Sequence, residues 1–169
     1  SAVVVSQTWG EVHRVNSHVR DALKSKGLLG ANDTTVQVLD KLDLTNAQKR
    51  DQRFYPPDAV VVFNQKVREA EPGAKGKLAG ILKSSVLVEV DGKFVPVSNR
   101  LLDRLSVCQA REFSVADGDR LHLKANRKLA SGGRVTNGEL VTVKSVGADG
   151  TIKLADGRVL DASYREFLP

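Results

Sequence analysis

The chain contains 169 residues, of which 41% are hydrophobic, enough to bury the core of one domain or of two small ones. Lysine and arginine number 26 against 20 aspartates and glutamates, and the resulting charge of +6 favours an acidic partner such as nucleic acid. The single cysteine, Cys108, excludes an internal disulfide framework and a zinc site built from several cysteines. No apolar run approaches the ~20 residues that a membrane span needs, so we expect a soluble, cytoplasmic protein with no membrane partner.

The sequence carries no recognisable catalytic or cofactor-binding motif. In Gly73–Leu78 the glycines are three residues apart, and leucine stands where a phosphate-binding loop needs serine or threonine. On a helix, His13 and His18 would lie about 140° apart and could not share a metal-binding face. No nucleophile elbow of the form G-x-S-x-G is present. We therefore expect a non-catalytic segment with no cofactor or metal, and a stand-alone enzyme is the weakest alternative.

The N-terminal residues predict a strand followed by a helix. Residues 2–6 form a short apolar run that is typical of a buried strand. Thr8 and Glu11 then match a capping box, apolar residues follow at helical spacing from Val12, and Gly27 stands at the expected left-handed C-cap. We expect residues 1–30 to be an α/β flank, half of a unit that lacks its second parallel strand. Such a half unit indicates a piece cut from a larger fold.

After a polar connector over residues 31–52, the hydrophobic period changes from that of a helix to that of strands. The connector holds a candidate strand at Thr35–Leu39 and a short charged helix at Thr45–Gln52, while residues 101–107 fit either helix or strand. Mainly antiparallel β-structure is predicted for the remainder, with tight turns at Asp91-Gly92, Asn137-Gly138, Asp149-Gly150 and Asp156-Gly157. The expected strands are Val60–Phe63, Gly80–Lys83, Val86–Val90, Phe94–Val97, Arg120–Ala125, Glu139–Val146, Thr151–Ala155 and Arg158–Asp161.

The strands fall into two sets, residues 53–110 and 111–169, that resemble an internal repeat. Gly76-Lys77-Leu78 parallels Gly138-Glu139-Leu140, and the Asp91-Gly92 turn parallels Asp156-Gly157. Such short strands joined by tight turns favour small, partly closed barrels. Convergent hairpin chemistry is the alternative to a repeat, and the sequence leaves open whether the sets form two barrels or one continuous sheet.

Five basic residues and no acidic residue occur between Arg120 and Arg134, around a flexible polar tip rich in glycine. A cationic hairpin of this kind is suited to following the phosphates of a nucleic acid, and a merely solvated loop is an equal alternative. No aromatic residue lies between Phe113 and Tyr164, so base stacking on this hairpin is not supported. The candidate contacts are Lys124, Asn126, Arg127, Lys128 and Arg134, with Asn137 and Gly138 shaping the loop.

Several short motifs, taken in order, resemble one family. The apolar run at residues 3–6 followed by Asn16 and Arg20 is similar to the start of the second motor domain of RecD-like superfamily-one helicases. The segments 123–127, 136–139 and 156–158, with Val143, resemble the Src-homology-3-like insert of these enzymes. The segment 55–63 resembles an entry strand of the conjugative branch, with Pro57 in place of its glycine. In sum the chain resembles the relaxase-helicases of conjugative plasmids, the TraI/TrwC (MobF) type.

The resemblance implies an internal segment of a plasmid-encoded DNA relaxase and ATP-dependent helicase, with one or two small Src-homology-3-like barrels in tandem. In that family the insert holds single-stranded DNA against the remaining motor domains. The same region carries an internal translocation signal, which the coupling protein of a type IV secretion system reads. The alternative function is a protein-interaction or scaffold module that does not bind DNA in isolation. For Asn16 and Arg20 a structural role is the favoured interpretation.

Overall fold

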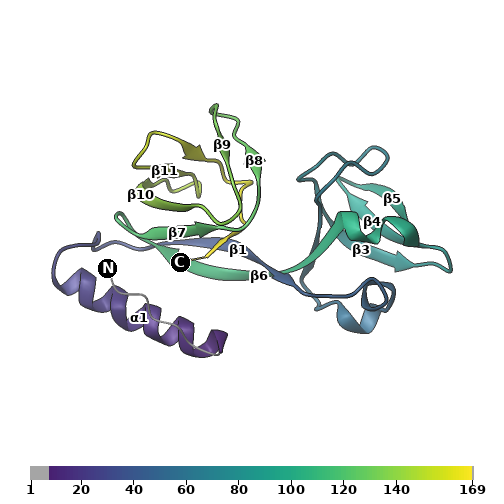
Figure 1. The fold of residues 1–169 in the computed structure, drawn as a ribbon, viewed down its shortest axis with the longest axis horizontal. Helices are drawn as coiled ribbons and strands as arrows, with labels where there is room; N and C mark the ends of the chain where they lie inside the picture. Colours follow the sequence, from purple (N-terminus) through teal and green to yellow (C-terminus); the bar gives the residue numbers. More distant parts are fainter. Residues whose placement is uncertain (1–7, 169) are drawn as a thin grey trace. The chain divides into compact units, whose positions relative to one another are not determined.

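The computed structural model describes residues 8–168, which form mostly antiparallel β-sheet with one α-helix (Figure 1). The chain divides into two compact units. Unit 1 comprises the residues up to Val36 and those from Phe113 onward, and unit 2 comprises Gln37–Glu112. The chain passes into unit 2 within β1 (Thr34–Leu42) and returns within β6 (Leu105–Val115). The helix expected as a separate flank therefore belongs to the same unit as the C-terminal strands.

The single described helix, α1, spans Trp9–Ser25 and begins and ends as its sequence predicts. The Thr8 hydroxyl accepts a hydrogen bond from the Glu11 amide at 3.3 Å, which confirms this half of the capping box. Gly27 adopts a φ of +68°, the left-handed conformation that terminates helices. The strand expected at residues 2–6 lies outside the described residues.

Arg20 fastens α1 to the rest of unit 1. Its guanidinium makes two hydrogen bonds to the buried Asp119 carboxylate, at 2.7 and 3.1 Å, and a third to Asp33 at 2.9 Å. It also lies 5.6 Å from the centre of the Phe113 ring. These contacts supply a structural reason for Arg20, the role that the sequence favoured over a DNA or nucleotide contact.

Unit 2 is built on a sheet in the order β1-β6-β2-β3-β4-β5. Its further strands are β2 (Ala59–Phe63), β3 (Lys75–Ile81), β4 (Ser85–Val90) and β5 (Lys93–Ser98). Asp91 and Gly92 both have positive φ and form the tight turn between β4 and β5, as predicted. Residues 101–107, for which the sequence left helix and strand open, contain both: the end of the 3-10 helix η3 (Asn99–Arg104) and the start of β6.

The charged helix expected at Thr45–Gln52 is wrong. Two 3-10 turns, η1 (Gln48–Arg50) and η2 (Gln52–Phe54), occupy this region instead. Lys49 is 8% exposed, and its ammonium donates hydrogen bonds to the carbonyl oxygens of Leu102 and Leu105, both at 2.8 Å. Burial lowers the pKa of this ammonium. The lysine thus provides hydrogen-bond donors for carbonyl oxygens at the end of η3, which is distant in the sequence.

The C-terminal part of unit 1 forms a second sheet in the order β12-β11-β10-β7-β13, beside a separate two-stranded ribbon of β8 and β9. The strands are β7 (Arg120–Leu123), β8 (Arg127–Lys128), β9 (Arg134–Val135), β10 (Leu140–Val146), β11 (Ile152–Leu154), β12 (Val159–Leu160) and β13 (Phe167–Leu168).

The two units share one strand order, which confirms the predicted repeat at the level of topology. In unit 2, β6 pairs with β2, and β3, β4 and β5 follow in sequence order. In unit 1, β13 pairs with β7, and β10, β11 and β12 follow in the same way. In both sheets the last strand of the set pairs with the first, β6 with β2 and β13 with β7, while β1 adds a sixth strand beside β6. The two sets therefore form separate sheets rather than one continuous sheet.

Candidate nucleic-acid interface

The predicted basic hairpin is the two-stranded ribbon of β8 and β9 (Figure 1). Arg127 pairs with Val135, and Lys128 pairs with Arg134. Leu129 and Val135 are buried, whereas Lys128 and Arg134 are exposed. Because residues directly opposite in an antiparallel pair share a face, Lys128 and Arg134 project together from the outer side.

Lys128 and Arg134 have no ion-pair partner among the described residues. Like charges directly opposite each other on a ribbon are destabilising. An anion placed between the two side chains would remove this repulsion and gain two charge-assisted contacts. The outer face of the ribbon thus has the electrostatics of a phosphate site.

Arg127 points to the inner side, where it already has partners. Its guanidinium lies 3.0 Å from a carboxylate oxygen of Glu166, whose side chain is only 9% exposed. It also lies 5.7 Å from the centre of the Tyr164 ring. Tyr164 is itself buried and donates a hydrogen bond through its hydroxyl to the Ala125 carbonyl at 2.9 Å. Arg127 is therefore a positioning residue that holds β8 in place.

Arg158 anchors the other strand of the ribbon. Its guanidinium donates a hydrogen bond to the Arg134 carbonyl at 2.7 Å and pairs with the carboxylates of Glu139 and Asp156. The hydrogen bonds from Arg158 lower the pKa of both carboxyl groups. The Ser131 hydroxyl adds a contact to the Val159 carbonyl at 3.3 Å. The tip expected to be flexible is thus tied to neighbouring strands on both sides.

The remaining predicted residues lie at the base of the ribbon. The side-chain oxygen of Asn126 accepts a hydrogen bond from the Asn137 amide at 2.8 Å, which joins the two ends of the hairpin. Gly138 has a φ of +89° and donates its amide to the Leu123 carbonyl at 2.8 Å. Lys124 follows β7 with an exposed side chain, while its amide donates to the Glu166 carbonyl at 2.8 Å. The backbone amides of Asn137 and Gly138 thus close the base of the ribbon, and Lys124 presents a third cation.

Sequence reasoning missed the residues that hold the ribbon. Glu166 and Tyr164 lie 39 positions from the residues they contact, and Arg158 lies 19 positions from Glu139. No periodicity or local motif links positions so far apart. The apolar Leu129, two positions after Arg127, was the available signal, because residues two apart on a strand share a face.

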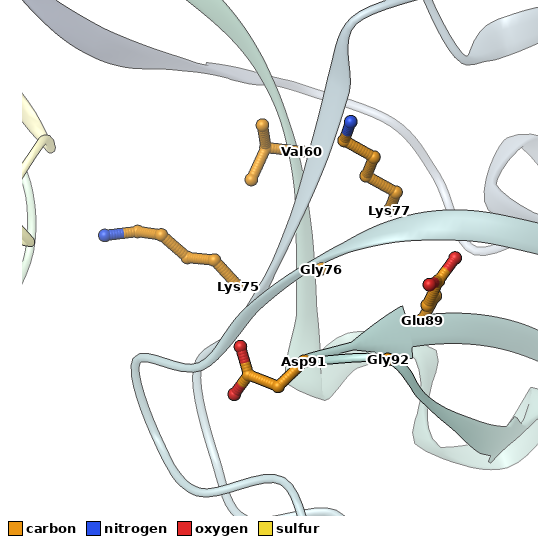
Figure 2. Close-up of a pocket in the computed structure, with 7 residues that line it drawn as sticks. All are labelled: Val60, Lys75, Gly76, Lys77, Glu89, Asp91 and Gly92. Carbon is orange, nitrogen blue, oxygen red and sulfur yellow. The ribbon is translucent and has the colours of Figure 1, made fainter.

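Unit 2 contains a shallow hollow of about 400 Å³, lined by Val60, Lys75, Gly76, Lys77, Glu89, Asp91 and Gly92. Figure 2 shows that the side chains of Lys75, Lys77, Glu89 and Asp91 extend from separate positions around the hollow. The charged groups around the hollow do not converge on a common point.

No protein-family model matches the chain, and the curated proteins include no detectable relative of it. No helix within residues 8–168 is long and apolar enough to cross a membrane. The same residues contain no group of three or more histidine, cysteine, aspartate or glutamate side chains arranged to hold a metal ion.

Proposed function

We propose that this chain is a non-catalytic module that holds single-stranded DNA by its phosphates on the outer face of the β8–β9 ribbon. The observation that carries the proposal is the exposed, unpaired Lys128 and Arg134 lying directly opposite each other. Lys124 extends the same cationic surface at the base of the ribbon. Arg127, Asn126 and Arg158 position the ribbon rather than contact the strand.

The ribbon suits this role because its cations are already in place before DNA arrives. Contacts with both Glu166 and Arg158 fix its backbone, so binding orders only the long side chains. Each phosphate contact to a single strand changes the slope of log affinity against log salt by about 0.7. At 0.1 M salt, this slope makes one lost contact equivalent to an affinity loss of about fivefold.

The resemblance to conjugative relaxase-helicases supplies the finer form of the proposal. Each unit would be a small Src-homology-3-like barrel, for which the return of the last strand to the first in both sheets is the support. In this form the chain belongs to a relaxase and helicase, contacts its motor domains and carries a translocation signal for the type IV coupling protein. The motifs around Asn16, Arg20 and residues 123–127 support this assignment.

The test is fluorescence anisotropy of a labelled ~20-nucleotide single strand across a salt series. We expect the variant with both Lys128→Gln and Arg134→Gln to lose about 1.4 units of salt slope relative to the wild type. The matched control carries Arg14→Gln and Lys26→Gln, two exposed cations of the α1 region, and has the same net charge. Equal slopes for the two variants would remove the ribbon from the DNA path. Absence of wild-type binding at low salt would overturn the proposal in favour of the protein-interaction module.

A further inference from the structure

A second cationic surface lies on the outward face of β7, β10 and β11, apart from the ribbon. In these strands the inward side chains are buried and apolar, whereas the outward side chains are mostly basic or polar. None of the outward residues is a carboxylate. They are Arg120, His122, Leu140, Thr142, Lys144, Ser145 and Lys153.

The strand register places the three cations of this sheet face close together. Arg120 lies opposite Thr142, and Lys144 follows two positions along the same strand. Lys153 lies opposite Ser145, beside the irregularity that contains Lys144. Steps of this kind across and along a sheet are on the order of 5–8 Å. The three side chains therefore form a diagonal row over three strands, and none has an ion-pair partner among the described residues.

An exposed apolar side chain accompanies this row. Leu140 is 60% exposed and lies opposite the half-buried His122. A leucine in this position gains nothing from water, and its burial against a flat apolar surface would be favourable. The faces of unpaired bases offer such a surface, whereas the bases of a duplex are stacked inside it.

We propose that the outward face of β7, β10 and β11 is a binding platform for an unpaired polynucleotide. The phosphates lie along Arg120, Lys144 and Lys153, and a base packs on Leu140 beside His122. This inference rests on the proposed function and deepens it, because it assigns the preference for single strands to a surface other than the ribbon. The ribbon contacts only the phosphates, whereas this sheet face also contacts an exposed base.

The test compares an intact single strand with an abasic strand of equal length and charge. We expect the wild type to bind the intact strand at least threefold more tightly, and Leu140→Ala to abolish this difference while leaving affinity for the abasic strand unchanged. The matched control is Leu28→Ala, since Leu28 is 65% exposed in the same unit but off this face. The variant with Lys144→Gln and Lys153→Gln should lose salt slope with both strands, by about 1.4 units.

The outcomes separate this inference from the proposed function. If Leu140→Ala retains the full preference for the intact strand, the sheet-face platform is overturned and the ribbon proposal is unaffected. If polyglutamate competes as well as the intact strand does, the surface recognises acidic protein and the inference also fails. If the wild type binds neither strand, the proposed function itself is wrong.

Discussion

Replacing Arg127 and Lys128 separately should distinguish a positioning residue from a phosphate contact in the same ribbon. The two residues are adjacent in β8 but project to opposite sides. Arg127→Ala would remove the guanidinium that pairs with the nearly buried Glu166 carboxylate. Lys128→Ala would remove an exposed charge that faces another cation, Arg134. We therefore expect the first change to act on stability and the second on DNA affinity.

The expected loss for Arg127→Ala follows from the burial of the pair. Breaking a fully buried ion pair by removing one partner costs about 3–5 kcal/mol. The Arg127 side chain is 21% exposed and Glu166 9% exposed, so solvent screening reduces the loss to about 2 kcal/mol. Loss of the contact with the Tyr164 ring adds about 0.5 kcal/mol. Lys128→Ala should stay within about 0.5 kcal/mol of the wild type.

Thermal denaturation followed by circular dichroism measures the first effect, and anisotropy at fixed salt measures the second. We expect Arg127→Ala to lower the melting temperature of unit 1 by ~10 °C. Glu166→Gln should recover part of this loss in the Arg127→Ala background, because it removes the uncompensated charge. The reasoning is refuted if Arg127→Ala melts like the wild type and weakens DNA binding as much as Lys128→Ala does.

Three further predictions concern acid, alkali and close packing. Because Arg158 lowers the pKa of Glu139 from its ordinary 4.5, this carboxylate stabilises the folded state above pH 4.5, and the stabilisation is lost as pH falls through the lowered value. The midpoint of urea unfolding should therefore fall less steeply with acid in the Arg158→Gln variant than in the wild type. An equal fall in the two proteins would contradict this prediction. Burial raises the pKa of Tyr55 and of Tyr164 from 10 to about 12. The contribution of the two phenols to the stability of the folded state is therefore complete below pH 10 and is lost as pH rises through 12. Phenolate absorbance near pH 10 in the folded protein would refute this prediction. A Cβ at Gly76 would lie 2.4 Å from the Glu89 carbonyl oxygen, whereas at Gly80 it meets nothing within 4 Å, so in urea unfolding Gly76→Ala should cost ~2–3 kcal/mol more than Gly80→Ala.

Local chemistry made the elements of this fold predictable. The hydroxyl of Thr8, the left-handed Gly27 and the Asp91-Gly92 turn each act within a few residues, so their geometry can be read from neighbouring positions. The repeat was visible for the same reason, because both sets use the same turn chemistry between their third and fourth strands. In place of the helix expected at residues 45–52 there are two 3-10 turns, in which the buried ammonium of Lys49 is bound to carbonyls more than 50 positions away, a contact that local sequence does not reveal.

The sequence by itself determined that this is a strand-rich, basic chain with a cationic hairpin between residues 120 and 134. Composition and short-range periodicity carry that information. Only the tertiary structure decided which cations are available to bind an anion, because ion pairs form between side chains that the fold brings together. Arg127 is bound by Glu166 and Arg158 by Glu139, contacts between distant positions that become possible only when the strands are paired. Lys128 and Arg134 remain open to an anion, since the ribbon's pleat turns them together toward the outer side.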